Sequence, residues 1–504
     1  MSVPQISLTF PGGPLASKGS KFSGGLFINN EFVASESGKT FAVVDPSTGK
    51  EIAQVAEASE KDVDIAVKAA QKAFDTVWGT KVPGHERGKL LMKLADLVEA
   101  NLDELASIES LDNGKPFSIA KGFDVSQVAA NLRYMGGWAD KNTGQVVETV
   151  ENKLTYTRHE PIGVCGQIIP WNFPILMFAW KIAPALATGN TIVLKTAEQT
   201  PLSALKMCEL IKQAGFPAGV VNVISGFGPV AGAAVASHMD IHKVAFTGST
   251  LVGRQIMKVA AQTNLKKVTL ELGGKSPNIV YDDADLEQAV KWAAFGFAFN
   301  AGQCCCAGTR VYVQESIHEK FMARLKEVIS GMHVSNPWDE KAFHGPLVSQ
   351  VQFDRVTGYI KKGVEEGAKI EIGGERHGNE GYFVQPTIFS NVKESHTIHK
   401  EEIFGPVVVT STFKDTDDLI AKANDSYYGL AAAVFSRDIS RALDTAHRLH
   451  AGTVWVNCYN LLDAQMPFGG YKQSGIGREL GQYALANYTN VKSVHVNINL
   501  PCPI

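Results

Sequence analysis

The strongest constraint on the fold is a regular alternation of short apolar runs with helical segments that begins near residue 162. Four such runs come before residue 250, at 162–169, 191–195, 220–224 and 243–246. Strands that alternate with helices in this way indicate a parallel sheet covered by helices. A second block with the same pattern extends from about 273 to 470 and contains the runs 310–313 and 407–410. We therefore expect an α/β protein.

Length and composition indicate the number of domains and limit the partners. The chain has 504 residues, too many for one ordinary core, and segments 61–74 and 85–106 carry apolar residues at helical spacing. Because the net charge is −3 and no long basic run occurs, nucleic acid is not an expected partner. The most apolar stretch, 175–180, is too short to span a membrane, so no membrane partner is expected.

The N-terminal residues indicate the cellular compartment. Residues 1–17 contain no Lys or Arg, whereas a secretory signal or a mitochondrial transit peptide carries basic residues, so we expect a cytoplasmic protein. The stretch to about Gly25 is rich in Gly, Ser and Pro and is expected to form a loose tail. Seven scattered cysteines in a long chain argue against a disulfide framework, so reduced thiols are expected.

Two segments alternate apolar and polar residues outside both blocks. They are 155–158 and 494–498, and in the second Val494, Val496 and Ile498 share one face. Strands placed so far from either block would leave exposed edges, which a second subunit could cover. We therefore expect a homo-oligomer that associates through these strands, with an edge inside the same chain as the alternative.

Two glycine-rich turns are candidates for a nucleotide site. Segments 226–232 and 248–253 each follow a strand and open a helix, but neither is a complete dinucleotide fingerprint, and each could be an ordinary turn. A helix N-terminus offers free N–H groups to a phosphate, and Ser249 could add a hydroxyl donor. Lys195 and Glu198 follow the run 191–195. A carboxylate there could accept both ribose hydroxyls and would repel a 2′-phosphate, which favours NAD over NADP; the alternative is that both are ordinary surface residues.

Three segments could carry chemistry. Cys304, Cys305 and Cys306 are consecutive, and since a tetrahedral metal clamp needs spaced cysteines, we expect no metal and one nucleophilic thiol, although a free cysteine is more often a core residue. Glu271 ends an apolar run, where burial would raise its pKa toward that of a general base; a capping or salt-bridged role is the alternative. Asn172 could donate its amide to an oxyanion, or form an Asx turn.

These motifs together resemble a known family. PWNFP at 170–174, LELGGKSP at 270–277, GQCCCAG at 302–308, EEIFGPV at 401–407 and PFGGYKQSG at 467–475 occur in the order seen in the aldehyde dehydrogenase superfamily. The similarity extends from about Leu26 to Val496 and is greatest to the broad-specificity, NAD-dependent cytosolic and mitochondrial tetrameric branch. It implies a Rossmann-like NAD-binding domain at 26–139 and 161–272, an α/β catalytic domain at 273–480, and a small β oligomerisation arm at 140–160 and 486–504.

The resemblance also implies an activity, a cofactor and residue roles. The expected reaction is NAD-dependent oxidation of aliphatic, acetaldehyde-like aldehydes, and by extension aromatic ones, to carboxylic acids, in a homotetramer. Cys305 is the nucleophile that forms a thiohemiacetal and then a thioester, Glu271 is the base for its hydrolysis, and Asn172 with the Cys305 backbone N–H forms the oxyanion hole. Lys181 and Glu479 resemble a proton exit path. The cofactor residues are Ile169, Trp171, Lys195, Glu198, Gly228, Gly248, Ser249, Gly273, Gln352, Glu402 and Phe404. The substrate channel is lined by Gln127, Phe173, Met177, Trp180, Leu462 and Phe468.

The chain departs from its relatives at a few positions. Leu462 stands where relatives often have an aromatic residue, which favours a wider channel, and Asn460 and Arg355 stand where an acidic residue and Lys are common. Two other functions remain as alternatives. A CoA-acylating semialdehyde dehydrogenase would need no hydrolytic base, so Glu271 argues against it. A ligand-binding protein without turnover is disfavoured because Cys305, Glu271 and Asn172 occur together.

Overall fold

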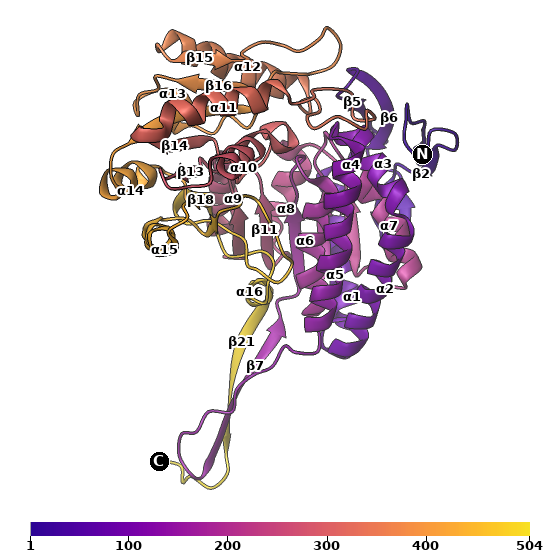
Figure 1. Cartoon of the computed structure of the whole chain (residues 1–504). Helices are drawn as coiled ribbons and strands as arrows, with labels where there is room; N and C mark the ends of the chain where they lie inside the picture. Colours follow the sequence, from indigo (N-terminus) through magenta and orange to yellow (C-terminus); the bar gives the residue numbers. More distant parts are fainter. Residues whose placement is uncertain (1) are drawn as a thin grey trace.

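The computed structural model describes residues 2–504 and contains two large sheets, each flanked by helices (Figure 1). The first sheet has the order β20-β12-β11-β8-β9-β10-β3-β4. Its strands are β3 (Leu26–Ile28), β4 (Glu31–Val33), β8 (Val164–Ile168), β9 (Thr191–Lys195), β10 (Val221–Ile224), β11 (Lys243–Thr247), β12 (Lys267–Glu271) and β20 (Gly475–Ile476). Strands β8 to β12 are parallel, which confirms the expected sheet.

The strand order creates a switch point in this sheet. The chain passes from the central strand β8 to β9 and β10 on one side, and then crosses to β11 and β12 on the other. Open α/β sheets bind ligands outside the carboxyl ends of the strands at such a point. The turns that follow β8 and β11 are therefore where a nucleotide site is expected.

Helices cover both faces of the first sheet because its strands are buried on both sides. Val193 and Val244 pack on one face, while Ile192, Leu194 and Ala245 pack on the other. The first face carries α1 (Glu60–Thr76), α8 (Ala233–Ser237) and α9 (Thr250–Gln262). The second carries α2 (Gly84–Ala100), α3 (Leu102–Asn113), α5 (Ser126–Trp138), α6 (Pro174–Ala187) and α7 (Leu202–Ala214).

The helical pattern at 85–106 belongs to two helices. Asn101 separates α2 from α3, and its side-chain Nδ2 donates to the backbone oxygen of Leu97 at 2.7 Å. An asparagine side chain competes with the helix for backbone groups, so it ends the first helix there. Apolar spacing continues across the break because both helices pack on the same face of the sheet.

The second sheet has the order β15-β16-β17-β14-β13-β18-β19, parallel except at its β15 edge. Its strands are β13 (Pro277–Val280), β14 (Arg310–Gln314), β15 (Lys369–Ile372), β16 (Thr387–Ser390), β17 (Val407–Phe413), β18 (Ala431–Phe435) and β19 (Thr453–Val456). Its helices are α10 (Leu286–Ala298), α11 (His318–Ser330), α12 (Gln350–Glu365), α13 (Thr397–Lys400), α14 (Thr416–Asn424) and α15 (Ile439–Arg448). The predicted second α/β block is therefore present.

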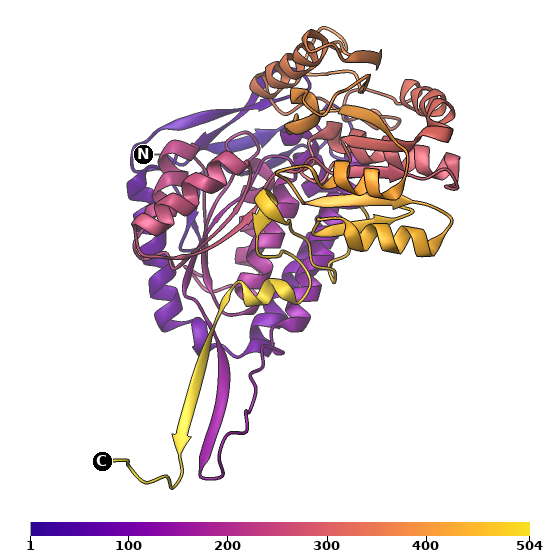
Figure 2. The ribbon, with the colours of Figure 1, turned by 90° about the vertical axis from the view of Figure 1, so that its left-hand side faces the viewer.

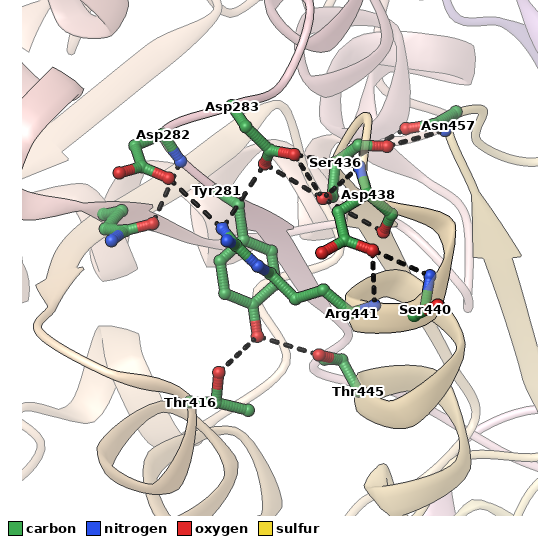
Figure 3. A network of polar contacts seen from close by, with 11 residues as sticks. Tyr281, Asp282, Asp283, Thr416, Ser436, Asp438, Ser440, Arg441, Thr445 and Asn457 are labelled. Atoms are coloured by element: carbon green, nitrogen blue, oxygen red, sulfur yellow. Dashed lines mark hydrogen bonds and ion pairs between the residues drawn. The ribbon is translucent and has the colours of Figure 1, made fainter.

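A polar network fixes α15 against the end of β13 (Figure 3). The carboxylate of Asp283 accepts from the Ser436 hydroxyl and from the Asp438 backbone N–H, both at 2.9 Å. The Arg441 guanidinium lies 3.5 Å from Asp283 and 5.1 Å from the centre of the Tyr281 ring. Since these groups satisfy one another, we assign the network a role in stabilising the domain.

The N-terminal residues are not the loose tail that the composition predicted. Ile6, Leu8 and Phe10 are at most 4% exposed and pack against a β-hairpin of the first domain. The prediction was wrong because this alternating apolar pattern finds a buried surface. The strands involved are β1 (Gln5–Leu8), β2 (Ser20–Ser23), β5 (Thr40–Asp45) and β6 (Lys50–Ala56).

The two alternating segments form a two-stranded arm that projects from the body (Figures 1 and 2). Strand β7 (Lys153–Pro161) pairs antiparallel with β21 (Thr489–Asn497) along its whole length, and α16 (Tyr483–Ala486) precedes the second strand. The two strands therefore pair within one chain, which was the alternative to association between subunits, and this pairing covers one edge of each strand. Val491 and Val496 are 63% and 40% exposed, so apolar surface remains on the arm. Association through the arm stays a prediction. No helix within residues 2–504 is long and apolar enough to cross a membrane.

Candidate active site

A cavity of about 1070 Å³, including space open to solvent, lies between the two sheets. It is formed by the turns after β8, β11 and β12 and by the cysteine loop before β14. Cys305, Glu271 and Asn172 all line it, although they come from three separate segments. The fold therefore brings together the three groups that the sequence singled out.

The cysteine loop presents one thiol to the cavity. Cys304 and Cys306 are buried, whereas Cys305 is partly exposed. The loop turns sharply before them, where Asn300 and Ala301 have φ of 52° and 56°, in the left-handed region. Such a backbone is strained for residues with side chains and often occurs at functional sites. One accessible thiol between two buried ones is the arrangement that the sequence predicted.

The surroundings of Cys305 favour its thiol over the thiolate. The neighbouring Cys304 thiol, together with burial, raises the pKa of Cys305 above its ordinary value. Because the thiolate and not the thiol is the nucleophile, a group that removes the proton is required.

Glu271, which lines the same cavity, is a candidate for that group. It is the last residue of β12, is 5% exposed, and its Oε2 atom has no hydrogen-bond partner within the described residues. Burial, reinforced by the negative charge of Glu479, raises its pKa well above the ordinary value. Within residues 2–504, the Oε2 atom of Glu271 therefore neither caps a helix nor forms a salt bridge.

Lys181 and Glu479 form a buried ion pair. Neither lines the cavity, but the charge of Glu479 is close enough to affect the pKa of Glu271. Lys181 lies on α6, and its backbone oxygen accepts from Gln167 Nε2 at 2.7 Å. The pair is thus fixed in the protein interior close to the proposed base.

Asn172 is held by long-range contacts. Its Nδ2 donates to the backbone oxygen of Gln303 at 3.1 Å, so its side chain does not form a local Asx turn. An amide nitrogen carries two hydrogens, which leaves the second one available to a group in the cavity. The Asn172 backbone oxygen accepts from Asn300 Nδ2 at 3.0 Å and from Lys115 Nζ at 3.1 Å.

A second cavity of about 1570 Å³ lies at the switch point of the first sheet. It shares Pro170, Trp171, Thr247 and Gly248 with the first cavity, so the two adjoin, and together they are called the cleft below. Among the predicted cofactor residues, it is lined by Ile169, Trp171, Lys195, Glu198, Gly228 and Gly248. The first cavity is lined by Trp171, Gly248, Ser249, Gly273, Gln352, Glu402 and Phe404.

The groups along this cleft fit a dinucleotide. Lys195 is 3% exposed, and its Nζ lies 3.3 Å from Glu198 Oε2, which places an ammonium and a carboxylate where ribose hydroxyls could bind both. Ser249 is the N-cap of α9: its Oγ accepts from the Val252 backbone N–H at 3.3 Å, so its own hydrogen remains available to a phosphate. A Cβ added to Gly228 would meet nothing within 4 Å, which leaves this wall open to a ligand.

The other end of the cleft holds a second carboxylate. Glu402 Oε1 accepts from the Gly274 backbone N–H at 3.1 Å, and burial raises the pKa of Glu402 to about 7. A Cβ on Gly273 would lie 2.1 Å from Glu402 Oε2, so only glycine admits this approach. Gln352 Nε2 donates to the Phe404 backbone oxygen at 2.7 Å and holds that segment in place.

Aromatic and aliphatic side chains line the rest of the first cavity. Five of the six predicted channel residues are among them: Phe173, Met177, Trp180, Leu462 and Phe468. Gln127 is not among them; its Nε2 donates to the Leu462 backbone oxygen at 3.3 Å and so contacts a residue of the channel wall. Leu176, Leu272 and Phe123 also line the cavity and were not predicted from the sequence. Leu176 shares the helical spacing of Phe173 and Trp180, which could have identified it, whereas Phe123 lies on a π-helical turn that no local pattern indicates.

Comparisons with known proteins agree with this arrangement. The sequence profile described as "Aldehyde dehydrogenase family" matches residues 32–494. The chain is 61% identical to an aldehyde dehydrogenase of Agaricus bisporus, over 94% of this chain and 95% of that protein. It is 54% identical to a mitochondrial aldehyde dehydrogenase of Rattus norvegicus, over 95% and 92%. It also resembles the solved NAD⁺ complex of a Bacillus cereus aldehyde dehydrogenase, with a TM-score of 0.93, 53% identity and coverage of 94% and 96%.

Proposed function

Because the chain belongs to the aldehyde dehydrogenase family, we propose that it oxidises aldehydes to carboxylic acids through a covalent intermediate on Cys305. It is an NAD-dependent oxidoreductase. The observation that carries the proposal is the convergence of one accessible thiol, one buried carboxyl and one amide donor on a single cavity. This set can attack a carbonyl carbon, remove a proton and stabilise an oxyanion.

The proposed reaction begins at the thiol. In its ionised form, Glu271 removes the proton of Cys305, directly or through water, and the sulfur attacks the aldehyde carbon to form a thiohemiacetal. The Asn172 amide, with the Cys305 backbone N–H that the family resemblance implies, stabilises the negative charge on oxygen. One such donor typically contributes about 10²–10³ in turnover. When bound, NAD supplies the hydride acceptor that makes the reaction an oxidation. Glu271 then removes a proton from the water that hydrolyses the Cys305 thioester.

Glu271 takes one proton from the thiol and a second from the water, and it must release each of them before it can act as a base again. We propose that the buried pair of Lys181 and Glu479 receives each proton. Glu479 Oε2 has no hydrogen-bond partner within residues 2–504, so it could accept a water that connects it to Glu271. Until that transfer, Glu271 can hold the proton because burial raises its pKa.

The channel favours an uncharged aldehyde. Phe123, Phe173, Leu176, Met177, Trp180, Leu462 and Phe468 carry no titratable group. Burying a charge without a partner is costly, so aldehydes with a carboxylate or an ammonium should bind poorly. We propose aliphatic aldehydes, and aromatic ones that Leu462 leaves room for, as the substrate class.

The decisive experiment measures NADH formation by absorbance with a panel of aldehydes, with NAD and NADP in parallel, and with and without CoA. The panel runs from acetaldehyde to long-chain, aromatic and charged aldehydes. Turnover with NAD and without CoA, lost in Cys305→Ala together with esterase activity, is expected. Dependence on CoA would favour an acylating dehydrogenase. Folded protein that binds NAD but turns over no aldehyde would favour a binding protein without turnover.

The oligomeric state and the cellular location are proposed on separate grounds. We propose a homotetramer that uses the arm of β7 and β21, whose exposed apolar residues a second subunit would cover. Sedimentation of the purified chain tests this, and a monomer at all concentrations would contradict it.

The cytoplasmic location stays a prediction because one relative is named as mitochondrial. Cell fractionation would decide between the two compartments.

A further inference from the structure

One buried cation, Lys115, lies beside the proposed oxyanion donor and takes no part in the steps above. It follows α3 directly after Gly114, which has a left-handed φ of 88°, and its side chain is 0% exposed. Its Nζ donates to the backbone oxygen of Asn172 at 3.1 Å and lies 4.4 Å from the centre of the Phe173 ring. A single ammonium thus contacts the proposed oxyanion donor and a channel wall.

The charge of Lys115 is balanced locally. Its Nζ donates to the carboxylate of Asp124, and Glu109 Oε1 lies 3.6 Å away. A buried charge with these partners has a defined position, because moving it would leave a carboxylate unpaired in the interior. The ammonium is therefore a fixed point for the groups that it contacts.

Helix α3 attaches to the same loop at two more positions. Asn113 Nδ2 donates to the Trp171 backbone oxygen at 2.7 Å. Glu109 Oε1 accepts from the Ile175 backbone N–H at 3.4 Å. Together with Lys115, these contacts hold residues 171–175, and among the three only the Lys115 side chain contacts Asn172 itself.

The partner of Lys115 comes from the π-helical turn Ala120–Val125. The same turn places Phe123 in the cavity wall, with its ring centre 6.4 Å from that of Phe173. Short π-helical segments occur often at functional sites. Here the turn directs one side chain to the substrate cavity and the next, Asp124, to the buried ammonium.

We propose that Lys115 is a positioning residue, which fixes the Asn172 amide toward Cys305 and the Phe173 ring against the channel. The Asn172 amide donates one N–H to Gln303, and the direction of its second N–H depends on the backbone that Lys115 holds. A displacement of about 1 Å in such a group can lower a rate by about 100-fold. The inference rests on the role proposed above for Asn172.

A double-mutant cycle tests this inference. Lys115→Met, Asn172→Ala and the double variant are compared for the acylation rate with p-nitrophenyl acetate, for kcat with aldehyde and for Tm. We expect Lys115→Met to lower the acylation rate by about 10- to 100-fold in the wild type. In the Asn172→Ala background it should change the rate by less than about threefold, because the donor that it positions is already absent.

The chain offers a matched control. Lys121 lies on the same π-helical turn, is 43% exposed at its side chain and pairs with Asp103 at the surface. Lys121→Met should leave acylation and kcat unchanged. If Lys115→Met lowers the rate equally in both backgrounds, Lys115 acts without Asn172. That result would overturn the positioning role of Lys115 but not the proposed oxyanion role of Asn172. A full rate in Asn172→Ala would overturn both the inference and the proposed oxyanion role.

A second pair of variants applies if Lys115→Met does not fold. Lys115→Gln with Asp124→Asn keeps an N–H donor for the Asn172 oxygen and removes both charges of the Lys115–Asp124 pair, while Glu109 is unchanged. Lys115→Leu with Asp124→Asn has the same charge but no donor. We expect the first variant to acylate at least tenfold faster than the second, and equal rates would overturn the inference.

Discussion

Replacing Glu271 with Gln removes the proposed base while the shape of the site is kept. The side chain is 5% exposed, and a Cβ on Gly469 would lie only 2.7 Å from its Oε1, so the space admits an isosteric residue and little more. Gln has almost the same volume, so the packing beside Cys305 should remain. The substitution therefore acts mainly on proton transfer.

The expected kinetic loss is large. A positioned general base typically contributes about 10²–10⁴ in rate, which corresponds to about 3–5 kcal/mol of activation free energy. The raised pKa of Cys305 means that thiol attack also requires a base, so acylation and hydrolysis should both slow. We expect kcat for acetaldehyde to fall by at least 100-fold.

The expected effect on stability has the opposite sign. The pKa of Glu271 is raised in the folded state above its ordinary value of 4.5, so the folded protein keeps a proton that the unfolded chain releases. Its contribution to the free energy of unfolding is therefore full below pH 4.5 and is lost as the pH rises toward the folded-state pKa. Gln does not titrate, so Tm of Glu271→Gln minus Tm of the wild type should increase from pH 5 to pH 8.

NADH absorbance gives kcat, and scanning fluorimetry between pH 5 and pH 8 gives the Tm difference. The exposed Glu340 provides a matched control, and Glu340→Gln should change neither kcat nor the pH dependence of Tm. A kcat within threefold of the wild type would show that Glu271 is not the base. A Tm difference independent of pH would show that its pKa is not raised.

Three further predictions concern Lys181, Glu198 and Leu462. Lys181→Met leaves Glu479 buried without its partner and should lower the free energy of unfolding in urea by about 3–5 kcal/mol; an unchanged midpoint would contradict the burial of the pair. Glu198→Gln removes the charge that repels a 2′-phosphate and should lower the ratio of kcat/KM with NAD to that with NADP by about tenfold or more; an unchanged ratio would show that another group reads the ribose. Leu462→Phe narrows the channel and should raise KM for long-chain aldehydes with little change for acetaldehyde; equal changes for both would place Leu462 outside the channel.

The sequence by itself determined the fold class and the chemical groups. Short apolar runs alternating with helices predict a parallel sheet because periodicity is a local property of the chain. Glu271 at the end of a strand, Asn172 in a proline-bounded loop and Cys305 in a glycine-bounded loop were recognisable for the same reason. Their order also revealed the family.

The tertiary structure alone decided which of these groups meet and what supports them. Ile6 and Leu8 are buried only because a distant hairpin covers them, and the two arm segments pair with each other across more than 300 positions of sequence. Lys115 is an isolated lysine in the sequence, and its role becomes visible only where the fold places it against Asn172. Burial and long-range hydrogen bonds depend on contacts between segments far apart in the chain, and a local pattern carries no information about such contacts.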